Sequence, residues 1–204
     1  MEQHRGRAPF MCFGLSVLLL LNTAGICAAA EFVADTTSSH PQGTFTGKTY
    51  VKGDKIRSEG VQGGRRTITI HRMDRGVTWI LLPDSKTYME MAGMEHSSLE
   101  DLDRAAQEMA DKKNLGTETI NGFLCDKYQY VYKDRDLGVV TQWVARDLKF
   151  PIRTEHSGAK GYGMKTELSN IQLQGLPDSL FELPAGYRKT GLPGMERPQK
   201  RPKP

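Results

Sequence analysis

Residues 55–91 constrain the fold more than any other part of the chain, because they hold four short runs of β-type residues separated by turn residues. Ile68 and Ile70 alternate with polar neighbours, which predicts a strand with one buried and one wet face. The run 77–82 is apolar on both faces, as expected where a sheet is covered on two sides. The turn residues between these runs predict antiparallel strands joined in sequence. This meander predicts an antiparallel sheet and does not by itself indicate a chemical activity.

Further runs on both sides of the meander extend the expected sheet. Asn121 and Gly122 form the strongest hairpin signal in the chain and are typical of a type I′ turn. In the run that follows them, Tyr128, Tyr130 and Tyr132 share one face. The expected strands cover residues 43–52, 56–61, 67–71, 77–82, 87–91, 117–120, 123–132, 138–145, 152–157 and 162–173.

Residues 97–113 are the one stretch that predicts a long helix. Ser97 and Glu100 match a capping box at its start, and Lys112 and Lys113 suit its C-terminal end. Its apolar residues recur at helical spacing but form a narrow stripe, so we expect the helix to lie against the sheet. The stripe consists of Leu99, Leu102, Ala106 and Met109.

These elements predict a mainly β protein with one long helix. A single sheet of so many strands tends to curl, and a curled sheet has a concave face. We therefore expect a curled antiparallel sheet that forms a half-open barrel, with the helix lying across the concave face as a lid over a cavity.

The ends of the chain differ in composition from its body. Residues 1–30 combine basic residues, an apolar run and a small-residue site, which predicts a cleaved signal peptide with cleavage between Ala30 and Glu31. The apolar run is short for a membrane anchor, and a lipid anchor on Cys27 is disfavoured by Ile26 before it. A periplasmic or secreted protein is expected, with a flexible lead-in or loosely paired edge over 31–42, a single domain over 43–187 and a disordered tail over 188–204.

The formal net charge of +4 arises mainly in this basic, proline-rich tail, which holds six Lys or Arg residues and one acid. Either the tail is simply solvated, or it contacts an anionic membrane surface. Nothing else in the sequence points to nucleic acid. Cys125 is the one cysteine after residue 30, and we expect it to be a small buried apolar residue, with an intermolecular bridge or a redox role as alternatives.

Several motifs resemble a known family. The segments GKTYVKGDKIR (residues 47–57) and WILLPDSKTY (residues 79–88) resemble the periplasmic lipoprotein-carrier superfamily, which includes outer-membrane lipoprotein-sorting proteins. The segments GFLCDKY (122–128) and LFELPAGY (180–187) are closer to an uncharacterised bacterial branch of it. The resemblance implies acyl-chain binding in an apolar cavity under a helical lid. Some members latch the lid with a buried arginine, but here we interpret Arg57 as a surface residue.

No catalytic constellation stands out, so the protein is predicted not to be an enzyme and to carry no cofactor. His71 and Asp74 are the nearest approach to an acid–base pair, but their spacing in a strand and turn directs them to different faces. Two hypotheses besides acyl-chain or lipoprotein binding stay open. One is a soft-metal protein that binds copper through Met89, Met91, Met94 and His96, and the other is a structural module with a filled core.

We expect a monomer whose cavity is lined by large apolar residues from both halves of the sheet and from the helix. Their facing is inferred from alternation alone, so an error of one residue in register would reverse it. The predicted lining is Trp79, Leu81, Met89, Met91, Leu102, Met109, Tyr130 and Trp143.

Overall fold

The computed structural model describes residues 30–62, 64–92, 98–158 and 163–191. These residues form one large sheet, the helix α1 (Leu99–Met109) and three short 3-10 helices, η1 (Met73–Arg75), η2 (Pro83–Ser85) and η4 (Asp178–Phe181). The strands are β1 (Glu31–His40), β2 (Gly43–Lys52), β3 (Lys55–Gln62), β4 (Arg65–Arg72), β5 (Val77–Leu82), β6 (Thr87–Ala92), β7 (Ala110–Ile120), β8 (Phe123–Tyr132), β9 (Val139–Ala145), β10 (Phe150–Ser157), β11 (Gly163–Leu173) and β12 (Arg188–Lys189).

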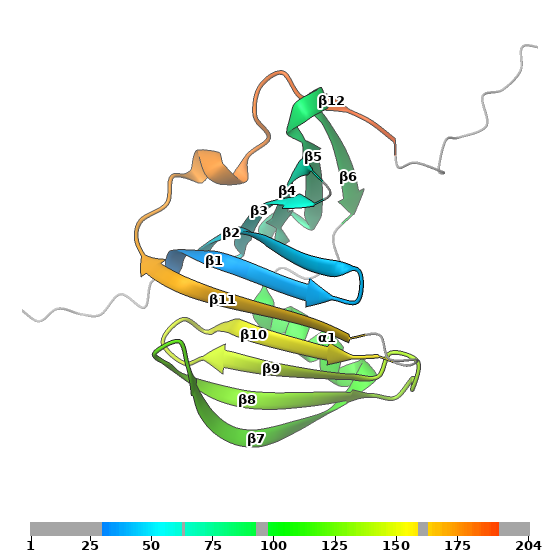
Figure 1. The fold of residues 1–204 in the computed structure, drawn as a ribbon, viewed down its shortest axis with the longest axis vertical. Helices are drawn as coiled ribbons and strands as arrows, with labels where there is room; N and C mark the ends of the chain where they lie inside the picture. The colour runs from blue at the N-terminus through cyan, green and yellow to red at the C-terminus, as the bar shows by residue number, and fades with distance from the viewer. Residues whose placement is uncertain (1–29, 63, 93–97, 159–162, 192–204) are drawn as a thin grey trace, which may run out of the picture.

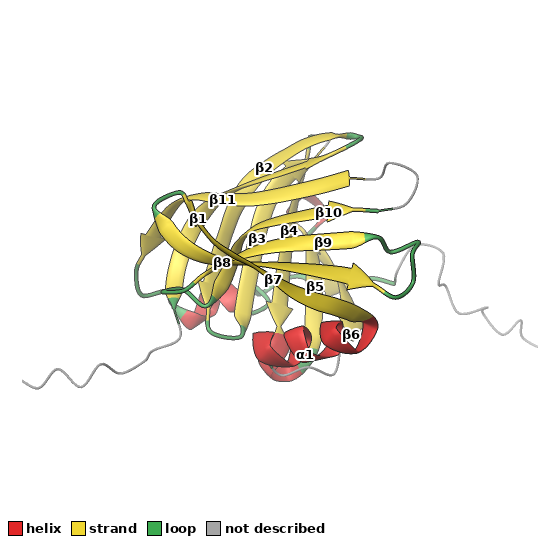
Figure 2. Ribbon diagram, turned by 90° about the horizontal axis from the view of Figure 1, so that it is seen from below, coloured by secondary structure: helices red, strands yellow, loops and turns green. Residues whose placement is uncertain are grey.

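The strand order across the sheet is β12-β6-β5-β4-β3-β2-β1-β11-β10-β9-β8-β7. Neighbouring strands are antiparallel, apart from the short parallel pair of β12 and β6. The sheet curls so that β3 to β6 recede behind β1 and β2, to the side on which α1 lies behind β9 and β10 (Figures 1 and 2). The predicted fold, a curled open sheet with one helix on its concave face, is confirmed.

The N-terminal stretch 31–42 corrects the expectation of a flexible lead-in. Residues 31–40 form β1, which lies in the middle of the sheet between β2 and β11. Its apolar residues Phe32 and Ala34 are buried. Its hydroxyls also find partners on the neighbouring strands, since Thr36 is 2.7 Å from the hydroxyl of Thr49. The polar composition therefore reflects a strand whose polar groups are paired, not an unstructured end.

The boundary between α1 and β7 also differs from the expectation. The helix ends at Met109, and residues 110–113, expected as its last turn, begin the long strand β7. Ala110 is buried and lies opposite Tyr132 of β8. Tertiary pairing with β8 thus outweighs the weak local preference for helix. The predicted turn is confirmed at Asn121 and Gly122, with φ of 48° and 85°, the two positive values that a type I′ turn requires.

The cross-strand register decides which side chains share a face, because directly opposed residues point the same way. The pairings between successive strands relate Gln142 of β9 to Ile80 of β5 and Met89 of β6. All three residues therefore lie on the concave face. The intervening residues of β5, among them Trp79 and Leu81, therefore lie on the convex face.

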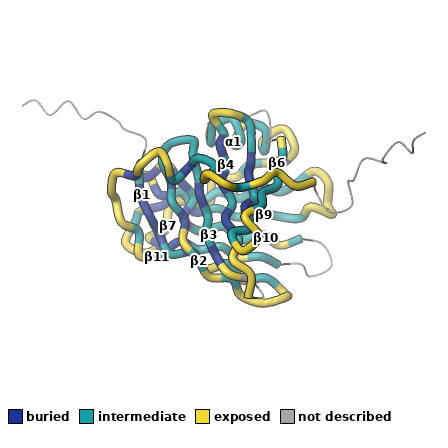
Figure 3. The backbone as a smooth tube through the Cα atoms, turned by 90° about the horizontal axis from the view of Figure 1, so that it is seen from above, coloured by how far each residue is buried: buried dark blue, intermediate teal, exposed yellow. Residues whose placement is uncertain are grey.

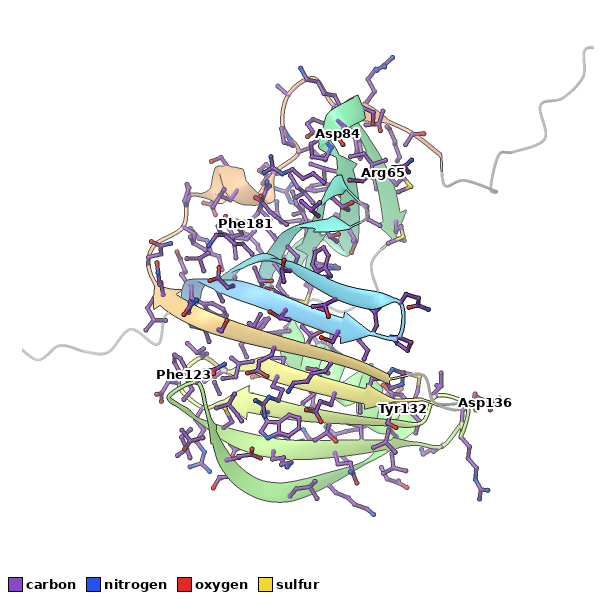
Figure 4. All side chains as sticks on the ribbon, in the orientation of Figure 1. Arg65, Asp84, Phe123, Tyr132, Asp136 and Phe181 are labelled. Carbon is purple, nitrogen blue, oxygen red and sulfur yellow. The ribbon has the colours of Figure 1, made fainter. Side chains whose placement is uncertain are left out.

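A C-terminal segment, residues 174–190, covers this convex face of β3 to β6. Phe181 of η4 is fully buried against it (Figure 4). Two buried arginines donate to its carbonyls, Arg57 to Leu180 at 2.8 Å and Arg72 to Phe181 at 3.3 Å. The apolar core beneath this segment is formed by Ile68, Ile70, Trp79, Leu81, Leu176 and Phe181.

A second core holds the other half of the sheet together. It centres on Phe32, whose ring meets that of Phe150 edge-on with 5.5 Å between centroids. The buried stretches of the backbone run through the sheet, and the exposed stretches lie mostly at turns and outer strands (Figure 3). This core is formed by Phe32, Ala34, Val51, Ile120, Cys125, Trp143, Ala145, Leu148, Phe150, Ile152 and Leu168.

Candidate functional site

The helix α1 begins at a side-chain cap. The Ser98 hydroxyl accepts a hydrogen bond from the backbone N–H of Asp101 at 3.1 Å and donates to the Asp101 carboxylate at 2.8 Å. The sequence predicted Ser97 as the cap. The structure places the cap at Ser98, one residue further along, and Ser97 itself lies outside the described residues. The cap fixes the start of the helix, so that Leu99 and Leu102 in its first turns face the sheet.

One carboxylate ties the middle of α1 to the sheet. Asp103 accepts hydrogen bonds from the Tyr130 hydroxyl of β8 at 2.5 Å and from the Lys112 ammonium of β7 at 2.8 and 2.9 Å. Burial opposes ionisation of Asp103, but these donors outweigh burial and lower its pKa. Burial and the nearby carboxylate raise the pKa of Tyr130, so its hydroxyl stays protonated. We call this set the Asp103 tether.

A cavity of about 340 Å³ lies between α1 and the concave face of β7 to β10. The helix contributes an apolar wall. The sheet contributes Tyr128, Tyr130 and Tyr132, which the alternation in the sequence predicted to share one face. Lys112 lies over the ring of Tyr128, with Nζ 4.3 Å from its centroid. The lining residues are Leu99, Glu100, Leu102, Asp103, Ala106, Lys112, Tyr128, Tyr130, Tyr132, Val140, Gln142, Val144, Lys149 and Pro151.

Of the eight residues predicted to line a cavity, only Leu102 and Tyr130 line this one. Met89 and Met91 lie on the same concave face, but on β6, far along the strand order from β8. Met109 ends the helix with half of its surface exposed. The narrow stripe on α1 thus reaches the sheet through its first two turns only.

The prediction that Trp79 and Leu81 line the cavity is corrected, because both are core residues of the convex side. Trp79 is opposite Ile70 and Leu81 is opposite Ile68, and all four lie under the C-terminal segment. Alternation correctly grouped Trp79 with Leu81, but it could not tell which face of the curled sheet the group occupies.

Trp143 also lies on the face opposite α1. Its indole N–H donates to Glu118 at 2.8 Å, and the cations of Lys127 and Arg153 lie 4.7 and 5.4 Å from the ring centroid. These charged side chains cover the ring, which is why a tryptophan can be buried on an outer face.

Arg57 is buried, which corrects its interpretation as a surface residue. Its guanidinium donates to Glu59 at 2.7 Å and to the Leu180 carbonyl at 2.8 Å. The residue therefore fastens the C-terminal segment to the convex face and has no role in holding α1.

The copper hypothesis rests on four residues, of which only Met89 and Met91 lie in the part of the chain that the structure describes. Met94 and His96 lie outside the described residues, and the part of the chain that is described contains no cluster of three His, Cys, Asp or Glu suited to a metal. His71 lies 3.1 Å from the Thr78 hydroxyl, and burial lowers the pKa of its imidazole. The Asp74 carboxylate accepts a hydrogen bond from the Arg72 guanidinium, so His71 and Asp74 do not form an acid–base pair.

Sequence reasoning missed most of the sheet side of the cavity. Lys112 was interpreted as part of the C-terminal end of the helix, so its contact with Asp103 across the α1–β7 boundary was not predicted. Val140 and Val144 alternate with Trp143 on β9, and the largest residue of that strand drew attention to the wrong face.

A family described as a domain of unknown function, DUF4412, matches residues 33–149, which is more than half of the chain. The chain belongs to the DUF4412 family. A search among curated proteins gives no match.

Solved structures share the fold at low sequence identity. A protein from Thermus thermophilus described as an uncharacterized conserved protein is 10% identical, with a TM-score of 0.59 over 81% of this chain and 93% of that chain. The MucA/MucB complex of Pseudomonas aeruginosa gives 13% identity and a TM-score of 0.53, over 76% of this chain and 56% of that chain. This DUF4412 chain thus spans little more than half of the matched chain in that complex.

A putative outer membrane lipoprotein-sorting protein domain from Vibrio parahaemolyticus is also matched, at 14% identity and a TM-score of 0.37 over 74% of this chain and 89% of that chain. The likeness of fold rests on the Thermus thermophilus protein and on the MucA/MucB complex, whose TM-scores are 0.59 and 0.53. Among the residues described, no helix combines the length and the apolar character needed to cross a membrane.

Proposed function

We propose that this protein is a non-enzymatic envelope protein that binds a hydrophobic ligand, an acyl chain either free or attached to a lipoprotein, in the cavity beneath α1. One observation carries the proposal: Leu99, Leu102 and Ala106 of the helix face apolar residues of β8 and β9 across about 340 Å³. This volume lies at the lower end of the range for small-molecule sites, which are mostly apolar with a few polar groups.

Three polar groups of the cavity are already paired with one another. Asp103, Lys112 and Tyr130 satisfy one another in the tether, so they do not require a polar partner from the ligand. The described lining contains no His, Cys or Ser that would suggest nucleophilic or acid–base chemistry. Binding without turnover is therefore the function we propose.

The proposed location follows from the N-terminal sequence. Residues 1–30 have the composition of a signal peptide, and a cleaved leader would deliver the protein to the periplasm or the exterior. We also propose that the basic residues after position 187 contact anionic headgroups, which would bring the cavity close to a source of acyl chains.

Replacing one apolar cavity residue by glutamate tests the function. The protein is purified from its own cell envelope as wild type, Leu102→Glu and Met109→Glu, and analysed by native mass spectrometry and denaturing lipid extraction. Both substitutions add one carboxylate to the same helix, but Leu102 lines the cavity and Met109 is half exposed. Met109→Glu is therefore the matched control.

We expect a discrete acyl species with wild type and Met109→Glu, and its loss with Leu102→Glu. Circular dichroism confirms that both variants are folded. The proposal is overturned if the acyl species persists in Leu102→Glu. It is also overturned if the wild type carries none and binds no added fatty acid in titrations, which would leave a structural module.

A further inference from the structure

A second cavity, of about 280 Å³, adjoins the first one at the start of α1. Its wall is made by residues of β2, β10 and the turn before β10, and it includes the buried apolar side chains Val51, Leu148 and Phe150. The two cavities have three lining residues in common, Leu99, Glu100 and Lys149. Residues that line both cavities lie between them, so these three form the partition.

Leu99 is the buried part of this partition. Glu100 and Lys149 are exposed, whereas Leu99 is partly buried and packs against the core that contains Phe150 and Leu148. Its position is fixed from both sides, because it follows the cap residue Ser98 directly and opens the helix that the Asp103 tether holds to the sheet. Of the three shared residues, Leu99 is thus the one whose side chain is partly buried where the two cavities meet.

The other direction out of the first cavity is less suited to an acyl chain. Toward β1 and β2 the concave face carries hydroxyls, among them Thr36 and Thr49, which are buried and bonded to each other at 2.7 Å. A chain that grows beyond the first cavity gains more by burial beside Val51 and Phe150 than over this row of hydroxyls.

We infer that Leu99 sets the length of the acyl chain that the protein accepts, with the end of the chain stopped against its side chain. This inference rests on the proposed function and specifies the ligand. The first cavity at 340 Å³ suits one chain, and the second would add almost as much space again if the partition were removed. The ligand class is thus a single-chain amphiphile of limited length.

Affinities for a series of saturated fatty acids from octanoate to stearate, measured by displacement of a fluorescent fatty acid, test this inference. In the wild type, affinity is expected to rise about fourfold for each added methylene and then to level off where the chain meets Leu99. In Leu99→Ala the rise is expected to continue for several more methylenes. In Leu99→Trp it should level off at shorter chains.

Leu102→Ala is the control, because Leu102 lines the first cavity but not the second. It should change the affinity for all chains to a similar degree and leave the length at which the rise ends unchanged. Leu99→Trp keeps the test decisive if Leu99→Ala fails to fold.

The outcomes separate this inference from the proposed function. If the wild type binds none of the fatty acids, both fail. If the wild type binds them but the levelling point is the same in the wild type and both Leu99 variants, the inference fails and the proposed function stands. Opposite shifts in Leu99→Ala and Leu99→Trp confirm it.

Discussion

The hydroxyl of Tyr130 on β8 donates a hydrogen bond of 2.5 Å to the carboxylate of Asp103 on α1. This contact joins the helix to the concave face at the middle of the cavity, and Lys112 of β7 completes it from the neighbouring strand. The tether holds the middle of this short helix, and the backbone hydrogen bond that Lys133 donates to the Met109 carbonyl at 2.9 Å holds its end.

Removing the donor should loosen α1 without altering the cavity wall. Tyr130→Phe keeps the ring and leaves Asp103 with Lys112, so we expect the free energy of local opening of α1 to fall by about 1 to 2 kcal/mol. Native-state hydrogen exchange of residues 99–109 measures this. Tyr128→Phe is the control, because no hydrogen bond of the Tyr128 hydroxyl occurs within the described residues. Equal exchange rates in wild type and Tyr130→Phe would contradict the role of the tether.

The tether should also respond to pH. Burial opposes ionisation of Asp103, yet the hydrogen bonds from Lys112 and Tyr130 lower its pKa below that of an unfolded aspartate, about 3.9. The stability that Asp103 contributes is therefore complete above that value and is lost as pH falls through the lower, folded-state pKa. We expect protection of α1 to decrease in this acidic range. Asp103→Asn should lack this particular decrease, and an unchanged acid response in that variant would argue against the assignment.

The C-terminal segment should be essential for stability through Phe181. Its side chain is fully buried among Ile70, Leu81 and their neighbours, so Phe181→Ala should lower the free energy of unfolding by about 3 to 5 kcal/mol. Leu173→Ala, at a side chain that is 66% exposed, should change it by less than about 0.5 kcal/mol. Urea unfolding followed by circular dichroism compares the two. Similar losses in both would show that Phe181 does not anchor the core beneath the C-terminal segment.

Arg57 should fasten the C-terminal segment and not the helix. Arg57→Ala removes the donors to Glu59 and to the Leu180 carbonyl, and we expect a loss of about 2 to 3 kcal/mol. Arg66→Ala is the matched control, because Arg66 pairs with the same Glu59 but is exposed, so its loss should be below about 1 kcal/mol. Hydrogen exchange should rise in residues 176–190 and stay unchanged in α1. The reverse pattern would make Arg57 a latch for the helix.

Cys125 should be unreactive in the folded protein. Its side chain is buried in the core that contains Phe32, and burial raises the pKa of its thiol, so little thiolate forms at neutral pH. We expect modification by a thiol reagent to be slow in the native state and fast after denaturation, as followed by mass spectrometry. Rapid labelling of native protein would revive the redox alternative for this residue.

Much of the local structure was accessible from the sequence. Alternation located the strands around Ile70 and Tyr130, and the Asn121–Gly122 turn was confirmed with both positive φ angles. The failures occurred where long-range pairing overrides local signals. The polar stretch after residue 30 is a central strand because β2 and β11 flank it, and residues 110–113 leave the helix because β8 pairs with them.

The candidate site was only partly predictable for a related reason. Leu102 and Tyr130 were identified because they repeat at the spacing of their helix and strand. Asp103 and Lys112 were missed, because their contact joins two elements whose relative position no local pattern records. Trp143 was misplaced, because its size suggested a cavity whereas cations on the outer face bury it.

The sequence by itself determined which residues share a face, since strand geometry makes side chains alternate whatever surrounds them. Trp79 and Leu81 therefore had to point the same way, and Met89 and Met91 likewise. Only the tertiary structure decided which face is concave and what covers each one. The direction of curl and the path of the C-terminal segment come from contacts between residues far apart in the chain, such as Arg57 with Leu180. With this curl the cavity lies under α1 on the concave face, and Trp79 and Trp143 lie on the convex face.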